Sequence, residues 1–232
     1  MDHFAYRDGV MHAEDVPLPV IADAVGTPVY VYSRATLERH ARVFREALAD
    51  VPDKLIAFAV KSNPNLAVLK VLGKQGMGAD VVSVGEMRRA LAAGIAPEMI
   101  VFSGVGKTAA EMVAALDAGI GQFNIESEEE GIELAAIAAA KGMTAQCTLR
   151  INPDVDAGTH DKISTGKADN KFGVPISEAG QIFGTLARLH SLDPTGSRGG
   201  DLGWLYPGDT VPEFEKAMNG LKINEISAPV RS

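Results

Sequence analysis

Lys61 is the side chain with the clearest chemical potential in this sequence. It directly follows the apolar run LIAFAV (residues 55–60), which is typical of a buried strand. A lysine at the carboxyl end of a strand in a parallel sheet stands where β/α-barrel enzymes keep their reactive groups. Such a lysine is either a nucleophilic amine that condenses with a carbonyl group or a surface charge that ends the strand. Its position alone leaves both interpretations open.

Three further polar residues stand at the ends of predicted strands or the starts of helices. Asp80 lies in the run ADVVS, Glu86 opens the helical stretch after it, and Arg150 ends the run CTLR. Glu86 has a plainer interpretation as a first-turn carboxylate that complements the helix dipole. Arg150 has one as a member of an ion pair at the sheet rim. The sequence therefore predicts an amine, acids and an arginine at one rim of a parallel sheet.

A repeating framework between residues 28 and 188 would bring these residues together. Short β-rich runs alternate there with Ala-rich amphipathic stretches, the pattern of successive βα units around a parallel sheet. The expected strands are residues 28–33, 55–60, 79–83, 99–104, 121–125 and 145–152. Ser33 and Ser127 are expected to be N-caps of the helices that follow them, and Gly142 is expected to end the second of these helices.

The number of strands predicts an incomplete barrel. A closed (β/α)8 barrel requires eight strands, and the sequence offers five or six. From Asp193 onward Gly, Pro and Asp separate single aromatic residues, and the alternation of helix and strand stops. We therefore predict an α/β fold with a partial TIM-type barrel over residues 1–188, followed by an α+β fragment over residues 189–232.

Many motifs, in one consistent order, carry a resemblance to a known family. They are TPVYVYS, FAVKSNPN, GADVVSVGE, RRALAAGI, IVFSGVGKT, FNIES, LRINPDVDAGTH, ISTG and NKFGV. Over roughly residues 3–188 the sequence resembles the diaminopimelate decarboxylases, which are fold-type III enzymes with an alanine-racemase-like barrel and belong to lysine biosynthesis. The resemblance implies pyridoxal 5′-phosphate as cofactor and an amino acid as the small-molecule substrate. It implies decarboxylation at the α-carbon, with the cofactor ring as electron sink.

The same resemblance assigns roles to the residues at the rim. Lys61 would form the internal Schiff base and later transfer a proton, and we expect the strand ends to shield its amine from water. Asp80 and Glu86 would lie near the cofactor ring. Arg150 would hydrogen-bond to the ring oxygen or to a carboxylate. The family's later histidine, glycine-rich phosphate loop, EPGR-like run and β-domain are not found in the sequence, so we expect impaired activity.

His160 and Cys147 are given mainly structural interpretations. His160 lies in the loop DAGTHDKISTG, which resembles a mobile segment near the family's active site, so a gating role and an ordinary loop position both stay open. Cys147 is the only cysteine, and we expect it to be a small apolar residue buried in its strand. A single cysteine excludes an intramolecular disulfide and a CxxC metal cluster, and no metal site is predicted.

The charge and hydropathy of the sequence argue against nucleic acids and membranes as partners. The chain has 22 Lys and Arg against 30 Asp and Glu, a formal charge of −8, and its basic residues form no run. Nucleic-acid binding is therefore not expected. The start lacks a basic region before an apolar one, and no long apolar run follows, so we expect a soluble cytoplasmic protein without a membrane partner. A homo-oligomer is compatible with this interpretation.

The end of the chain resembles a second family. The runs SLDP, GGDLGW, VPEFEKA and LKINEISAPV are similar to the middle of a parvulin-type peptidyl-prolyl isomerase. By that resemblance Asp193 occupies the position of a parvulin Cys or Asp. The proline pocket would be formed by Leu202, Thr210 and Phe214, and such a pocket favours the twisted amide. Alternatively, Leu202, Trp204 and Phe214 form only a small hydrophobic cluster.

Three functions compete for this chimeric sequence. The first is a decarboxylase-derived protein that binds pyridoxal phosphate through Lys61. The second is an isomerase or proline-binding module carried by the barrel half. The third is a non-catalytic fusion fold in which parvulin-like segments cover an open barrel edge. The helix expected over residues 177–189 fits either parent, so the sequence leaves the junction open.

Overall fold

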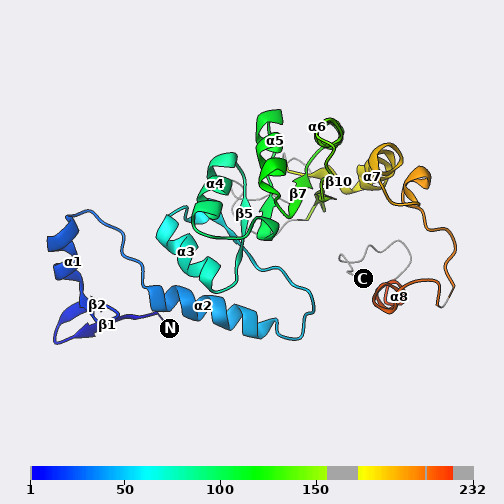
Figure 1. Ribbon diagram of the computed structural model, residues 1–232. Coiled ribbons are helices and arrows are strands. Elements are labelled where there is room, and N and C mark those ends of the chain that lie inside the picture. The colour runs from blue at the N-terminus through cyan, green and yellow to red at the C-terminus, as the bar shows by residue number, and fades with distance from the viewer. Residues whose placement is uncertain (1, 156–171, 207, 222–232) are drawn as a thin grey trace. The chain divides into compact units, whose positions relative to one another are not determined.

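The computed structural model describes residues 2–155, 172–206 and 208–221 (Figure 1). Contacts between Cα atoms divide the chain into two compact units, Met1–Ala179 and Gly180–Ser232. The division falls inside helix α7 (Ile176–His190), nine residues before the boundary predicted after residue 188. The two units are described separately.

The first unit begins with an antiparallel sheet that the sequence analysis did not predict. Its strands are β1 (Phe4–Arg7), β2 (Val10–Ala13) and β3 (Val16–Pro17), and helix α1 (Leu18–Val25) follows. Glu14 links this sheet to the start of helix α2 (Arg34–Ala47). Its Oε1 accepts hydrogen bonds from the Ser33 hydroxyl and the Ala35 N–H, each at 2.8 Å. These bonds, that of Ala35 first, lower the pKa of Glu14.

The strand predicted over residues 28–33 is wrong. Residues 28–33 form no strand and pair with no strand in the described part of the chain. Tyr30 is 88% exposed and Tyr32 is 49% exposed. β-branched and aromatic residues favour extended backbone, but a strand also needs a neighbour that accepts its hydrogen bonds. The β-propensity of these residues is therefore not enough to make a strand.

The central sheet of this unit is parallel and runs in chain order. Its five strands are β4 (Ala57–Ala59), β5 (Gly78–Val81), β6 (Ile100–Phe102), β7 (Gln122–Ile125) and β8 (Cys147–Leu149). A further parallel pair, β9 (Ile151–Asn152) with β10 (Val174–Pro175), continues the row. Arg150 joins the two, because its N–H donates to Ile125 O at 2.8 Å and its carbonyl accepts from Val174 N at 2.9 Å. The partial barrel predicted from the sequence is confirmed.

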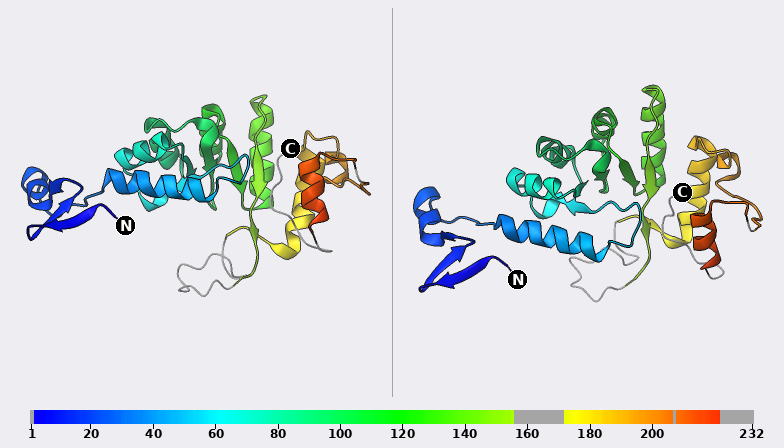
Figure 2. Two further views of the ribbon diagram at one scale, coloured as in Figure 1. Left: turned by 90° about the horizontal axis from the view of Figure 1, so that it is seen from below. Right: turned by 60° about the horizontal axis from the view of Figure 1, so that its bottom comes forward.

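Helices follow one another along one side of this sheet (Figures 1 and 2). They are α3 (Leu66–Lys74), α4 (Val84–Ala92), α5 (Ala109–Ala118) and α6 (Glu128–Ala140), with the short turns η1 (Val60–Ser62) and η2 (Pro97–Met99). The core lies between helices and strands. Phe102 and Phe123 are at its centre, with ring centroids 6.3 Å apart, and Met112 on α5 is fully buried. The core fixes which strand face is apolar and leaves the other face for polar residues.

Side-chain caps begin the helices as predicted. The Ser33 hydroxyl accepts from Thr36 N, and the Ser127 hydroxyl accepts from Glu130 N. Helix α5 begins with a capping box in which Thr108 and Glu111 satisfy each other's backbone N–H groups. Glu111 also accepts from Val84 N at 3.0 Å, so one carboxylate caps two helices. This bond from Val84, followed by those from Thr108, lowers the pKa of Glu111.

Replacement of Glu111 by Gln should reduce the loss of stability in acid. A carboxyl whose pKa is lowered by folding stabilises the protein above its ordinary value of 4.5, and that stabilisation is lost as the pH falls through the folded value. The unmodified chain should therefore lose up to about 1 kcal/mol more than Glu111→Gln on going from neutral pH to pH about 3. Urea unfolding followed by circular dichroism measures this. Glu129→Gln, an exposed acid in the first turn of α6, should behave like the unmodified chain.

The described part of the second unit is mainly helical. After α7 come the short turn η4 (Gly196–Arg198) and helix α8 (Pro212–Asn219). Trp204 is 93% exposed and Leu202 is 40% exposed, so the hydrophobic cluster of these residues with Phe214 that we considered is wrong. Single aromatic residues among Gly and Pro do not bury one another without regular elements to bring them together. In neither unit does a described helix have the length and apolarity needed to cross a membrane.

Candidate active site

Lys61 lies where the sequence placed it, in the turn η1 directly after strand β4. The preceding Val60 is fully buried and holds the turn against the core. Ser62 donates to Ala59 O at 2.7 Å, and this bond closes the turn. Lys61 itself is exposed and makes no hydrogen bond or ion pair with any described residue. We expected the strand ends to shield this amine from water, and that expectation is wrong: no described residue covers it. The described residues leave the amine open to an incoming group.

Asp80 on β5 belongs to a row of polar side chains that crosses the sheet face opposite the helices. Its Oδ1 accepts from the Ser103 hydroxyl at 2.6 Å, and that hydroxyl accepts from Asn124 Nδ2 at 3.0 Å. The oxygen of Asn124 accepts from Thr148 at 2.8 Å and from Gln122 at 2.7 Å. Thr148, Asn124 and Ser103 each donate to the next member of the row in the direction of the carboxylate. The row therefore orients Asp80 from as far away as strand β8.

Glu86 occupies the plainer of its two predicted roles. It lies in the first turn of α4, its N–H donates to the Ser83 hydroxyl, and its Oε2 accepts from Val82 N at 2.9 Å. The carboxylate thus satisfies a backbone donor where the strand turns into the helix. Its approach to a cofactor ring stays a prediction.

Arg150 is held by an ion pair at the rim, as its alternative interpretation proposed. Its Nη1 donates to both oxygens of Glu126, at 3.0 and 3.1 Å. The Glu126 side chain is 2% exposed, while that of Arg150 is 35% exposed. The guanidinium also lies over the ring of Phe172, 4.9 Å from its centroid. One end of the arginine is fixed and part of its surface still faces solvent.

The strand register brings some of the predicted residues together and separates others. Ala59 lies opposite Asp80, so Lys61 follows β4 directly beside the strand that carries Asp80. Arg150 follows β8, four strands from β4 in the sheet order. At about 4.8 Å between strands this is roughly 19 Å along the sheet. Lys61 and Asp80 thus belong to neighbouring strands at one end of the strand order, and the ion pair of Arg150 with Glu126 lies toward the other end.

Lys107 and Glu130 form a buried ion pair that the sequence analysis missed. The Nζ of Lys107 donates to Glu130 Oε1 at 2.5 Å, to Asn124 O at 2.7 Å and to Gly104 O at 2.9 Å. The side chains are only 1% and 9% exposed. Both residues belong to conspicuous runs, GVGKT and the acidic stretch after FNIES. All three acceptors of Lys107 are within the protein. The amine of Lys61, in contrast, has no acceptor among the residues that the structure describes.

The predicted parvulin-type residues are not gathered by any hydrogen bond within the described part of the second unit. Asp193 accepts from the hydroxyl and N–H of Thr195, at 2.5 and 2.8 Å, and these bonds lower its pKa. Phe214 lies in α8, and Leu202 is partly exposed. The hydroxyl of Thr210 is buried and has no hydrogen-bond partner in the described part of the chain. A proline pocket here stays a prediction.

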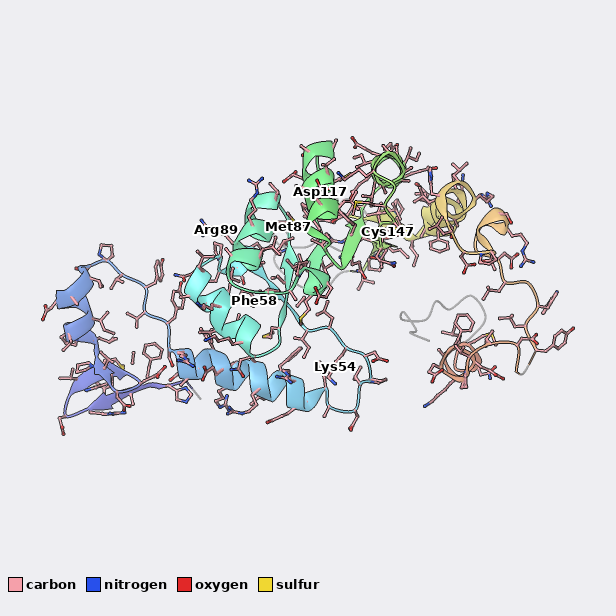
Figure 3. The ribbon with its side chains drawn as sticks, in the orientation of Figure 1. Lys54, Phe58, Met87, Arg89, Asp117 and Cys147 are labelled. Carbon is pink, nitrogen blue, oxygen red and sulfur yellow. The ribbon has the colours of Figure 1, made fainter. Side chains whose placement is uncertain are left out.

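Cys147 corrects one expectation, and His160 lies outside the described residues. Cys147 is on β8 (Figure 3) and is exposed, not buried as we expected. The first two residues of this strand are both exposed, so its apolar pattern did not produce burial at this edge. In the part of the chain that the structure describes, no three His, Cys, Asp or Glu side chains are grouped to hold a metal ion.

Two family models match the chain in succession. The model of the pyridoxal-dependent decarboxylase, pyridoxal binding domain, matches residues 34–198. The model of the PPIC-type PPIase domain matches residues 174–232. Both matches include helix α7, which confirms that this helix fits either parent. The chimeric composition predicted from the motifs is thereby confirmed.

Curated relatives and solved structures agree on the first part. The chain is 55% identical to the diaminopimelate decarboxylase of Zymomonas mobilis over 82% of its own length and 45% of the relative's. It is 53% identical to that of Vibrio cholerae over 84% and 47%. The structure of the M. jannaschii enzyme in complex with L-lysine superposes with a TM-score of 0.73 at 34% identity, covering 83% of this chain and 45% of that one.

The chain thus spans about half the length of the curated relatives that it matches. Within that half, Lys61 follows the first strand of the parallel sheet, an oriented Asp80 lies on the next strand, and a fixed Arg150 follows the last strand. The family match covers most of the residues in the chain, including all of these. The chain belongs to the pyridoxal-dependent decarboxylases, through their pyridoxal binding domain.

Proposed function

We propose that the first unit binds pyridoxal 5′-phosphate covalently through Lys61, as part of an amino-acid decarboxylase of the diaminopimelate type. The observation that supports this most directly is the contrast between two lysines. Lys107 is buried with three acceptors, whereas Lys61 stands at a strand end with no partner among the described residues. An amine that is not engaged in the fold is the one able to attack an aldehyde.

The side chains present fit the ring end of the cofactor. When bound, pyridoxal phosphate supplies an electron-accepting ring that stabilises the charge left at the α-carbon as carbon dioxide departs. Lys61 supplies the nucleophilic nitrogen and, once released, carries a proton to or from the substrate carbon. Asp80 presents an oriented acceptor beside it. Arg150 offers a fixed guanidinium to an anionic oxygen of the cofactor or the substrate.

Titration of the full chain with pyridoxal phosphate tests this proposal. We expect a visible absorbance band from the imine, which forms with loss of water. Borohydride reduction of that imine should leave one phosphopyridoxyl group on the peptide that contains Lys61. A flat spectrum would refute covalent binding. Release of carbon dioxide from diaminopimelate, compared with release from lysine and ornithine, tests the reaction separately. We expect weak or no turnover, because the relatives are about twice as long as this chain.

A second candidate function, prolyl isomerisation or proline binding, is favoured by the PPIC-type match over residues 174–232. A protease-coupled assay with a prolyl peptide tests it against the uncatalysed exchange, which takes tens of seconds or more. A rate equal to the uncatalysed one would remove this candidate. If neither assay gives a signal, the non-catalytic fusion is what stands.

A further inference from the structure

We propose that Glu126 is a positioning residue that aims Arg150 and fastens two backbone segments around it before any cofactor binds. It touches neither Lys61 nor Asp80, and no motif assigns it a role. The inference rests on the proposed function only for the ligand of Arg150, an anionic oxygen of the cofactor or the substrate. The fastening itself is a property of this chain's own residues.

The carboxylate of Glu126 is saturated by donors from three different segments. Oε1 accepts from Gly104 N at 2.8 Å, in the segment after β6, and Oε2 accepts from Gly173 N at 3.2 Å, just before β10. Both oxygens accept from Arg150 Nη1. A carboxylate that is almost fully buried needs this set of partners, because an unpaired charge there would be costly. The ends of β6, β7 and β8 are thereby joined at one point.

The two glycines allow this close approach. Gly104 has φ +105° and Gly173 has φ +71°, values that favour glycine. A Cβ on Gly173 would lie 2.7 Å from the carbonyl oxygen of Arg150, so no other residue fits there without movement. The chain is thus built to bring these N–H groups to Glu126 beside the Arg150 backbone.

The buried ion pair of Lys107 and Glu130 holds the backbone of Glu126 and of its partner Gly104. Glu130 Oε2 accepts from the N–H of Glu126 at 3.2 Å, and Lys107 donates to Gly104 O at 2.9 Å. Gly104 is therefore held on its N–H by Glu126 and on its carbonyl by Lys107. Arg150 is the only partner of Glu126 in this set with a side chain that reaches solvent. The guanidinium of Arg150 is therefore the one group of this network that can contact a ligand from solvent.

Hydrogen exchange in the full chain without cofactor tests the fastening. In Glu126→Gln, an isosteric change, we expect the amides of Gly104 and Gly173 to exchange about tenfold faster or more, because neutral acceptors hold donors more weakly than a carboxylate does. Glu129→Gln, an exposed acid three residues further along, should leave both amides unchanged. Unchanged exchange in Glu126→Gln would overturn the proposal. If Glu126→Gln does not fold, Glu126→Asp keeps the charge but shortens the reach, and the same comparison applies.

A double-mutant cycle tests whether Glu126 acts through Arg150. The dissociation constant of pyridoxal phosphate is measured for the unmodified chain, Glu126→Gln, Arg150→Gln and the double variant. We expect Glu126→Gln to weaken binding about tenfold alone but less than about twofold when Arg150 is already replaced. Additive losses would refute action through Arg150. No binding by the unmodified chain would refute the proposed function, and the exchange experiment would still decide the fastening.

Discussion

Lys61→Ala is expected to abolish covalent attachment of pyridoxal phosphate. The visible band and the borohydride-trapped peptide should both disappear, because the reacting nitrogen is gone and Lys107, with its three internal acceptors, cannot replace it. Stability should change by less than about 0.5 kcal/mol, since Lys61 is exposed and unpaired among the described residues. Loss of the band with intact folding is therefore the expected result.

Lys70→Ala is the matched control, because Lys70 is also exposed and lies on the nearby helix α3. It should keep the full band. Lys61→Arg retains the positive charge and should also lose the band, which separates covalent attachment from simple attraction of a phosphate. A trapped cofactor in Lys61→Ala would show that another amine carries the group and would refute the assignment.

Lys107→Met is expected to destabilise the first unit by about 3–5 kcal/mol, the usual effect of leaving one member of a buried ion pair without its partner. Glu130 would remain 9% exposed in its side chain without a countercharge, and two backbone carbonyls would lose a donor. Urea unfolding must be followed by far-ultraviolet circular dichroism. The single tryptophan, Trp204, lies in the second unit and would not report on this one.

The control for this loss is Lys141→Met. Lys141 pairs with Asp117 at 2.7 Å, but the two side chains are 27% and 56% exposed, so removal should cost less than about 1 kcal/mol. The double variant Lys107→Met with Glu130→Leu should recover part of the lost stability, because no buried charge then remains. Equal losses at positions 107 and 141 would contradict the argument from burial.

The sequence was sufficient for elements whose signal is local. Apolar runs predicted β4 to β8, since each of these strands places at least one apolar side chain in or against the core cluster. Ser33 and Ser127 were predicted as caps because a cap needs only its own first turn. The strand predicted over residues 28–33 was wrong because a strand forms only with a pairing partner, and that partner must come from elsewhere in the chain. The predicted burial of Cys147 was wrong for a related reason: the sequence of a strand does not show whether another element packs over it.

The candidate site divides in the same way. Lys61 and Asp80 were found because one lies just after an apolar strand and the other within one. Glu126 was missed, although it directly follows β7, because its partners come from positions 104, 150 and 173 and nothing local marks that convergence. Lys107 was missed because a lysine in a glycine-containing turn resembles a surface residue until Glu130 is placed beside it. Long-range pairing of charges is the information that the motifs did not contain.

Helix α7 shows how two unrelated ancestries can share one uninterrupted stretch of backbone. Residues 174–198 satisfy both family models, and α7 occupies most of them. A helix bonds each N–H to a carbonyl four residues earlier, whichever gene the residues came from. A helix that satisfies both family models can therefore continue from one kind of sequence to the other without a break in its backbone hydrogen bonds, and only its side chains differ between the two families.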